Sequence, residues 1–144
     1  MISLRLVTKD NIEEIIALEV QEKQKDFVLS NVISIAQAYV QPECKPVAIY
    51  ENDTPVGFMM YCIDSDDDEY WIYRLMIDQK FQRQGFAKKA TELMIKEIKK
   101  DKSRNKIFLG LDQKNECAAK LYQSLEFKFN GQAFGKEQIM VLEY

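Results

Sequence analysis

The segment of this chain best suited to bind a phosphate group is Gln82–Ala87, with the sequence QRQGFA. A strand-like apolar run, 71–77, leads into it, and a pattern typical of an amphipathic helix, 87–98, follows it. A turn that opens a helix offers unpaired backbone N–H groups at the positive end of the helix dipole, and both favour an anion. Its glycine lets a ligand approach the backbone closely, and its arginine and the lysine that follows add positive charge. The segment therefore predicts a phosphorylated ligand.

Two longer phosphate-binding signatures are absent from the chain. A P-loop requires G-x-x-x-x-G-K-[ST], and a dinucleotide fingerprint requires G-x-G-x-x-G after the first strand of a βαβ unit. What remains is [Q/R]-x-x-G-x-[G/A], placed in the middle of the chain. An ordinary polar loop before a helix has the same short pattern, so the turn alone does not identify the ligand.

The chain contains no histidine. This excludes Ser-His-Asp and Cys-His catalysis and His-ligated zinc, so proton transfer must use Tyr, Cys, Lys, Asp, Glu or water. Cys44, Cys62 and Cys117 are widely spaced and form no CxxC pair. We expect reduced thiols, because a cysteine nucleophile usually requires a histidine partner.

Length and composition indicate one globular domain, 1–144, with an apolar content of 47%. No apolar run is long enough to cross a membrane, and residues 1–7 alternate like a strand and lack the features of a signal peptide. We therefore expect a cytoplasmic protein that binds no membrane. The net charge of −3 argues against a nucleic-acid-binding module and is compatible with a cationic substrate.

The elements that must position the turn follow from hydrophobic periodicity. We expect the order β-α-α-β-β-β-α-β-α-β-β, an α/β or α+β fold with a mixed, mostly antiparallel sheet flanked by helices. Residues 47–77 are expected to form an antiparallel meander, and the helix 87–98 to cross over to a parallel neighbour. The apolar positions of the first two helices are expected to face the core: Ile12, Ile15, Ile16 and Val20 in the first, and Val32, Ile35, Ala36 and Tyr39 in the second, which spans 31–40. The other predicted elements are strands 2–7, 47–50, 56–63, 70–77, 107–111, 127–129 and 138–142, and helix 115–125.

A second motif follows downstream, Asn115-x-x-Ala118-x-x-Leu121-Tyr122-x-x-Leu125-x-Phe127. Together with the turn and the order of elements, it resembles the GNAT superfamily of N-acetyltransferases over essentially the whole chain. The family pattern is N-x-x-A-x-x-L-Y-x-x-x-G-F, and Glu126 stands here where the family often has glycine. Ala87 stands where the turn often ends in glycine.

The resemblance implies acetyl-CoA as the acetyl donor and no metal. It implies that the backbone amides of the turn hold the pyrophosphate, that the end of strand 70–77 pairs with the pantetheine arm, and that Asn115 contacts this arm. It places Tyr122 near the sulfur, as the general acid that protonates the leaving thiolate. Tyr122 also lies on the apolar stripe of its helix, and a tyrosine can bury its ring while it presents its hydroxyl. The full set of cofactor-binding residues implied in this way is Leu75, Met76, Ile77, Gln82, Arg83, Gln84, Gly85, Phe86, Ala87, Lys88 and Asn115.

The N-terminal part indicates a subgroup. Gln24-x-x-Phe27-Val28-x-x-Asn31-x-x-Ser34-x-Ala36-Gln37-Ala38 is similar to the N-terminal helices of bacterial spermine/spermidine acetyltransferases. The same residues can instead be packing positions with Asn31 as a helix cap. The resemblance implies a polyamine acceptor that attacks the thioester directly in a ternary complex.

The general base and the acceptor's second ammonium group have several candidate partners. The acidic run Asp64–Glu69 could attract an ammonium group or could be a solvated loop that keeps a sheet edge soluble. The candidate bases are Glu69, Asp68, Glu22, Glu19 and Tyr73. A different amine acceptor, such as a peptide N-terminus, a lysine or an aminosugar, and a module that binds acyl-CoA without catalysis remain alternatives. A homodimer is possible through a late strand such as 138–142.

Overall fold

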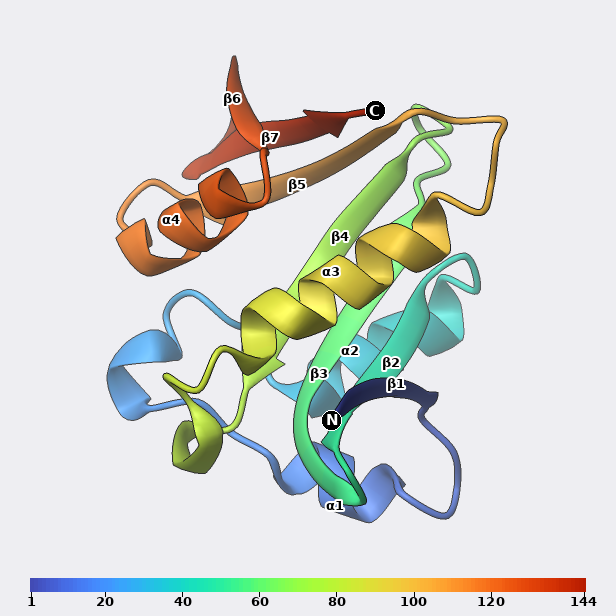
Figure 1. Ribbon diagram of the computed structural model, residues 1–144, viewed down its shortest axis with the longest axis vertical. Helices are drawn as coiled ribbons and strands as arrows, with labels where there is room; N and C mark the ends of the chain where they lie inside the picture. Colours follow the sequence, from blue (N-terminus) through green and yellow to red (C-terminus); the bar gives the residue numbers. More distant parts are fainter.

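One seven-stranded sheet, in the order β1-β2-β3-β4-β5-β7-β6, runs through the computed structural model, which describes residues 1–144 (Figure 1). The β2–β3–β4 meander is antiparallel, and α3 connects β4 to β5, its parallel neighbour, so both predictions are confirmed. The predicted fold class is confirmed too. The strands are β1 (Ile2–Leu6), β2 (Lys45–Glu51), β3 (Thr54–Ile63), β4 (Tyr70–Ile77), β5 (Lys106–Asp112), β6 (Lys128–Phe134) and β7 (Glu137–Glu143).

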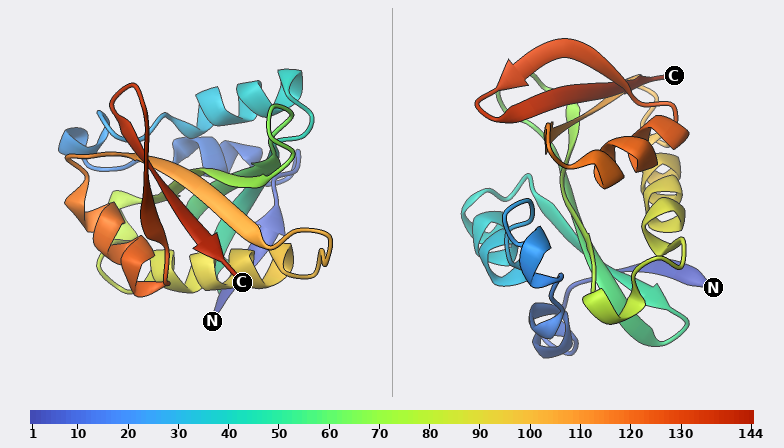
Figure 2. Two further views of the ribbon diagram at one scale, coloured as in Figure 1. Left: turned by 90° about the horizontal axis from the view of Figure 1, so that it is seen from above. Right: turned by 90° about the vertical axis from the view of Figure 1, so that its left-hand side faces the viewer.

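Helices cover both faces of the sheet (Figure 2). α3 and α4 lie on one face over a core that includes Met94, Leu109 and Phe127, and α1 and α2 lie on the other face over a core that includes Ile15 and Phe58. None of these helices is long and apolar enough to cross a membrane. Their bounds are α1 (Ile12–Ala17), α2 (Asn31–Val40), α3 (Phe86–Ile98) and α4 (Glu116–Ser124), with short 3-10 helices η1 (Glu22–Gln24) and η2 (Gln79–Phe81).

Several predicted boundaries were wrong. α1 is only six residues long and follows Asn11, so Val20 is buried outside it, and Ile16 is exposed. β6 and β7 are each seven residues long, and β6 runs through Gly131, which the sequence places in the connection between the two strands. Pairing with β7 extends β6, whose local sequence is a poor strand former.

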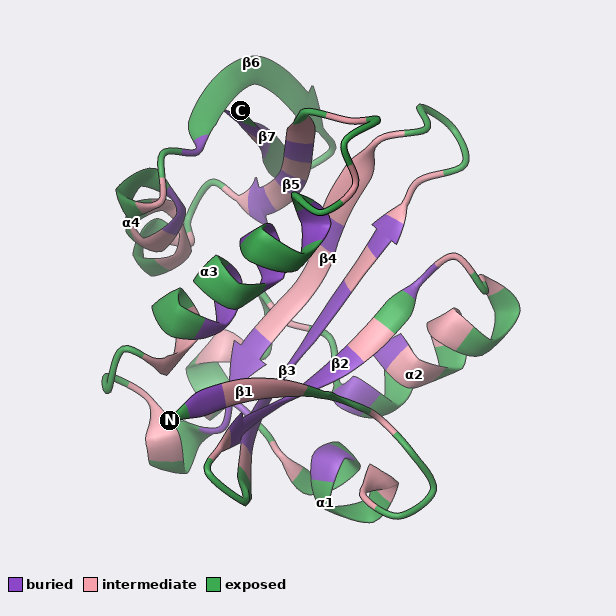
Figure 3. Ribbon diagram, turned by 45° about the vertical axis from the view of Figure 1, so that its right-hand side comes forward, coloured by how far each residue is buried: buried purple, intermediate pink, exposed green.

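The buried face of α2 differs from the predicted one. Val32 and Tyr39 are 55% and 88% exposed, whereas Asn31 and Ser34 are almost fully buried (Figure 3). Asn31 is not the helix cap: Ser30 accepts from the N–H of Ile33, and the Asn31 side chain donates to the carbonyl of Ile15 at 2.8 Å. Two polar residues of α2 therefore face the sheet, and Asn31 finds a specific hydrogen-bond partner there.

Both edges of β7 are paired within the chain, with β5 on one side and β6 on the other. The residues 138–142 are therefore not available to pair with a second subunit. The strand at this edge of the sheet is β6, which is exposed along its whole length.

Candidate functional site

The parallel strands β4 and β5 are paired only at their beginnings. The ladder joins Tyr70–Ile72 to 107–109 and stops there, although β4 continues to Ile77 and β5 to Asp112. The two strands then diverge, with α4 beyond the end of β5 and the start of α3 beyond the end of β4 (Figure 1). We call this the β4–β5 fork. It leaves the β5-facing backbone edge of β4 unpaired past Ile72.

A β-bulge at Tyr73 lies where the fork begins. Met60 of β3 is opposite Arg74 and Tyr61 is opposite Ile72, so Tyr73 has no partner in the ladder. A bulge bends its strand and increases the local twist. It also changes the alternation of side chains, so that Tyr73 and Arg74 both contact groups on the α2 face. The bulge thus accounts both for the divergence of β4 from β5 and for two polar side chains at the fork.

The turn before α3 has the backbone of an anion site. Arg83 has φ +64° and Gly85 has φ +80°, so two left-handed residues stand within three positions. Alternating backbone handedness turns successive N–H groups towards one concavity, which suits an anion. No other atom would lie within 4 Å of a Cβ added at Gly85, so the positive φ, rather than crowding within the protein, is what requires glycine.

The backbone N–H groups of the turn lack acceptors within the chain. None of the N–H groups from Arg83 to Lys88 donates to a protein carbonyl or side chain, and the first helical bond runs from Lys89 to the carbonyl of Gly85 at 3.2 Å. Gly85 is the N-cap and has no side chain to cap the helix. The turn thus presents free donors over a continuous stretch, together with the positive end of a thirteen-residue helix. These groups fit a pyrophosphate.

The side chain of Gln82 holds the turn in place. Its Nε2 donates to the carbonyl of Ile77 at 2.9 Å and to Oε1 of Gln24 at 2.9 Å. Gln82 thus ties the turn to the end of β4 and to η1. Its side chain supports the donors of the turn and is not itself free for a ligand.

Asp78 also holds the segment before the turn in place, a role that was not predicted from the sequence. Its side chain is buried, and it accepts from the N–H of Glu19 at 2.9 Å and from the N–H of Lys80 at 3.0 Å. The signal in the sequence was an aspartate directly after an apolar strand, which is a common cap for a short helix.

Leu75, Met76 and Ile77 lie on β4 past the last β4–β5 pair. Their other edge is paired with β3, and their side chains pack into the cores on the two faces of the sheet. Only their backbone edge along the fork is therefore available to an extended ligand, as the prediction of backbone pairing requires.

Tyr122 lies in α4, 7% exposed, with its ring edge-to-face against Phe127 at a centroid distance of 5.5 Å. Its hydroxyl makes no hydrogen bond within the chain, and it is not among the polar atoms sealed from solvent without a partner. Burial raises the pKa of Tyr122 above its usual range. The phenol therefore keeps its proton at neutral pH.

Asn115 is the N-cap of α4, and its Oδ1 accepts from the N–H of Ala118 at 3.3 Å. This bond fixes the direction of the side-chain amide, whose NH₂ group makes no hydrogen bond within the chain. Asn115 follows the end of β5, on the side of the fork opposite the turn.

The α2 face of the fork carries two hydrogen-bonded pairs. The Tyr73 hydroxyl donates to Asp64 at 2.5 Å, and the Arg74 guanidinium donates to Oε1 of Gln37 at 2.8 Å. Burial and the bond to Asp64 raise the pKa of Tyr73, and burial lowers that of Arg74. Nε of Arg74 is buried without a partner, as is Oγ of Ser34, one turn before Gln37 on α2.

The candidate bases are spread over three places. Asp68 and Glu69 precede β4 at its paired end, away from the fork, and Asp68 forms an ion pair with Arg104 at 2.9 Å. Glu19 and Glu22 both pair with Lys25 beside the turn. Tyr73 is the only one of the five on the strand that borders the fork.

The acidic run Asp64–Glu69 is a loop, as predicted, and much of it has internal partners. Besides Asp64 and Asp68, Asp67 accepts from the indole N–H of Trp71 at 2.8 Å. These contacts favour the interpretation that the run is a structural loop.

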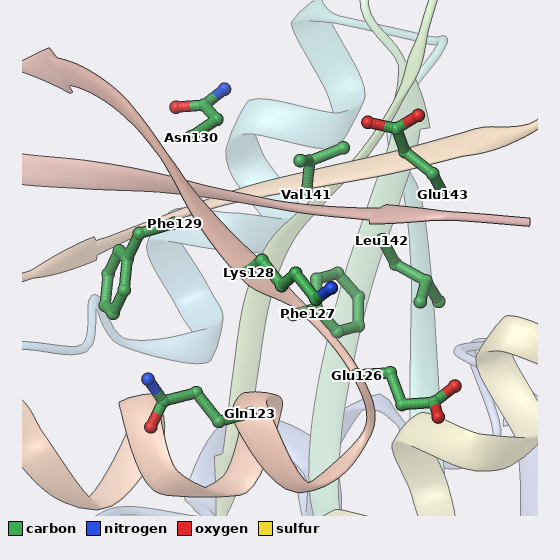
Figure 4. A pocket seen from close by; sticks show the side chains of 9 residues that line it. All are labelled: Gln123, Glu126, Phe127, Lys128, Phe129, Asn130, Val141, Leu142 and Glu143. Atoms are coloured by element: carbon green, nitrogen blue, oxygen red, sulfur yellow. The ribbon is translucent and has the colours of Figure 1, made fainter.

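A concavity of about 880 Å³ lies elsewhere, between the end of α4 and the strands β6 and β7. Its polar side chains do not converge: Asn130 and Glu143 lie on one side of the crossing strands, and Gln123 and Glu126 on the other (Figure 4). It therefore lacks the arrangement of a binding site. No group of three or more Cys, Asp or Glu side chains is placed to hold a metal ion.

Comparisons with known proteins identify this arrangement. Residues 11–127 match the model of the acetyltransferase (GNAT) family. A spermine/spermidine N(1)-acetyltransferase of Bacillus subtilis (strain 168) is 32% identical over 149 residues, which cover 99% of this chain and 98% of the relative.

Two solved structures share the fold at low sequence identity. An aminoglycoside acetyltransferase in complex with coenzyme A superposes with a TM-score of 0.82 at 14% identity, over 99% of this chain and 95% of its own. A spermidine N-acetyltransferase from Vibrio cholerae, in complex with CoA and spermine, superposes with a TM-score of 0.77 at 14% identity, with the same coverage.

Proposed function

The chain belongs to the GNAT family of acetyltransferases, and we propose that this acetyl-CoA-dependent N-acetyltransferase acts on a polyamine such as spermidine or spermine. The observation that carries the proposal is the extent of the similarity to the Bacillus subtilis spermine/spermidine enzyme. It spans 99% of this chain, and so includes α1 and α2 as well as the turn before α3. The helices on the α2 face border the acceptor side of the fork, whereas the turn serves the donor.

The donor is held by the backbone in this proposal. The N–H groups from Arg83 to Lys88 bind the pyrophosphate, and the unpaired edge of β4 from Leu75 to Ile77 pairs with the pantetheine arm. The Asn115 amide reaches the arm from the β5 side. Gln82 and Asp78 keep the donor groups in position, as their hydrogen bonds to Ile77 and Glu19 indicate.

Tyr122 is the general acid. Its raised pKa keeps the phenol protonated, and its hydroxyl has no competing acceptor within the chain. The hydroxyl donates its proton to the departing sulfur and regains one from solvent. This assignment agrees with its buried ring, because edge-to-face packing on Phe127 fixes the direction of the C–O bond.

Direct transfer, without an acetylated cysteine, is favoured by the state of the two buried thiols. Cys44 and Cys62 are buried on the α2 face, and burial raises the pKa of both, that of Cys62 to about 12. Neither forms a thiolate readily at neutral pH, and the thiolate is the nucleophile in cysteine catalysis. The acceptor amine therefore attacks the thioester itself.

The amine must be deprotonated before it attacks, because a free alkylamine has a pKa of about 10. Tyr73 lies at the start of the fork, and its hydroxyl donates a hydrogen bond to Asp64, which is partly exposed. We assign the pair as the route by which the amine proton leaves, with Asp64 as the final acceptor and Tyr73 as the group next to the amine.

The test is a turnover screen with acetyl-CoA and a panel of amines: spermine, spermidine, an aminoglycoside, lysine and a peptide N-terminus. The acetylated product is measured by mass spectrometry, because the exposed Cys117 would react with thiol reagents. We expect kcat/KM to be highest for a polyamine. A clear preference for a peptide or an aminoglycoside would refute the polyamine assignment and leave the family membership untouched.

A further inference from the structure

The carboxylate of Glu137, the first residue of β7, lies over Gly110 of β5. A Cβ built on Gly110 would stand 3.3 Å from Oε2 and 3.5 Å from Oε1 of Glu137. In the ladder Glu137 is opposite Asp112, so its side chain reaches diagonally back to the residue two positions earlier on β5. The carboxylate can lie there because glycine leaves the space free.

This position borders the β4–β5 fork. Gly110 is the first residue of β5 after the last pair with β4, which joins Ile72 to Leu109. Leu109 packs into the core under α3, so its neighbour Gly110 presents the opposite face, on which α2 lies. Glu137 therefore lies on the α2 face. Figure 2 shows that this face is opposite the one covered by α3, whose preceding turn holds the donor in the proposed function.

Electrostatics connects the two arms of the fork. Burial lowers the pKa of the Arg74 guanidinium on β4, and the charge of Glu137 offsets part of this effect. The two groups form no direct ion pair, and Arg74 donates to the carbonyl of Tyr73 and to Gln37 instead. The carboxylate of Glu137 is thus not neutralised by a cation in contact.

The partner of Glu137 in the ladder is also acidic. Asp112 is directly opposite on the same face, and like charges at such a cross-strand position are destabilising. The side chain of Glu137 takes part in no ion pair or hydrogen bond within the chain, whereas Oδ1 of Asp112 accepts from the N–H of Lys114 at 2.8 Å. An ammonium group beside Glu137 would relieve this repulsion.

We propose that Glu137 binds a non-reacting ammonium group of the acceptor, and so selects diamines and polyamines over monoamines. The inference rests on the proposed function, since it requires an acceptor with a second charge. A carboxylate in contact with the reacting nitrogen would stabilise its charged form and oppose attack. The Glu137 carboxylate lies over Gly110, to one side of the fork. It is therefore suited to bind the ammonium group that stays charged throughout the reaction.

The experiment compares Glu137→Gln with the wild type and with Glu143→Gln. Glu143 is an exposed glutamate at the other end of β7, opposite Lys106, and it serves as the matched control. For each protein, kcat/KM is measured for spermidine and for n-butylamine, which has one amine only. Binding of spermidine is measured by calorimetry as a readout independent of turnover.

We expect Glu137→Gln to lower the spermidine to butylamine ratio of kcat/KM about tenfold, mainly through KM, and to weaken spermidine binding by a similar factor. Butylamine kinetics and the thermal midpoint should stay close to wild type, as should all values for Glu143→Gln. An unchanged ratio in Glu137→Gln, in an enzyme that acetylates spermidine well, would overturn the inference alone. A wild type that acetylates no polyamine would overturn the proposed function and the inference together.

Discussion

Replacing Tyr122 by phenylalanine separates the proposed catalytic role of this residue from its structural one. The change removes the hydroxyl and keeps the ring, which is 7% exposed and packs edge-to-face against Phe127. The hydroxyl makes no hydrogen bond within the chain, so no partner is left unsatisfied. We expect the free energy of unfolding to change by less than about 0.5 kcal/mol.

Turnover should respond very differently. Loss of a general acid typically lowers the rate about 10²- to 10⁴-fold, which corresponds to roughly 3 to 5 kcal/mol in the barrier. Because the burial of Tyr122 raises its pKa, the wild-type acid should remain protonated, and kcat should not fall through its titration below about pH 10. Acetyl-CoA affinity should be retained, because the turn before α3 is not altered.

Three measurements are needed. Mass spectrometry of the acetylated amine gives kcat and KM, urea unfolding gives the stability, and calorimetric titration gives the affinity for acetyl-CoA. Tyr70→Phe is the matched control. Tyr70 lies at the paired end of β4, and its hydroxyl donates to Asp101 at 3.0 Å. This variant should lose about 1 kcal/mol of stability and keep its turnover, the reverse of Tyr122→Phe. If Tyr122→Phe retains kcat within twofold of the wild type, Tyr122 is a packing residue only and the general acid lies elsewhere.

Three further predictions follow from single observations. Gly85→Val should weaken acetyl-CoA binding at least tenfold by calorimetry, because a β-branched residue at φ +80° is strained and displaces the N–H groups of the turn; unchanged affinity would refute the assignment of the turn. Ser34→Ala should leave the protein as stable or up to about 1 kcal/mol more stable in urea, because its buried Oγ has no partner; a marked loss would show that this hydroxyl is in fact hydrogen-bonded. The free energy of unfolding should fall as the pH rises from about 9 towards 12. The unfolded chain releases the protons of Cys62 and Tyr70 near the ordinary thiol and phenol pKa values, whereas burial raises both pKa values to about 12 in the folded protein. A urea midpoint that is constant from pH 8 to 11 would contradict this.

The turn before α3, which we propose to hold the donor, could be predicted from the sequence because its determinants are local. The residues of the turn are consecutive, and its glycine stands between an apolar strand and an amphipathic helix. The left-handed backbone at Gly85 was not part of this prediction, which relied on the close approach that a glycine allows. The helix after it and the meander before it have clear periods of 3.6 and 2 residues. Even here the sequence did not reveal that the side chain of Gln82 is engaged with Ile77 and Gln24, because that depends on how η1 lies against the turn.

The features on the proposed acceptor side could not be predicted because their determinants are pairings between distant segments. Neither glycine nor proline marks the bulge at Tyr73, which appears only in the register between β3 and β4. The approach of Glu137 to Gly110 requires the pairing of β5 with β7, although the two residues are 27 positions apart in the sequence. A glutamate in a polar connection between strands gives no signal of its own.

The orientation of α2 shows why periodicity failed for this part of the molecule. An apolar stripe normally marks the face of a helix that packs on the core, yet here Asn31 and Ser34 face the sheet and Val32 and Tyr39 face outwards. The Asn31 side chain donates a hydrogen bond to the carbonyl of Ile15. Further along α2, the Gln37 side chain accepts a hydrogen bond from Arg74 of the bulged strand. The bulge that opens the fork therefore also supplies the partner that fixes the polar face of α2. This hydrogen bond joins the bulged strand to α2, so we expect substitutions at Gln37 or Arg74 to raise KM for the amine more than they weaken acetyl-CoA binding in a calorimetric titration.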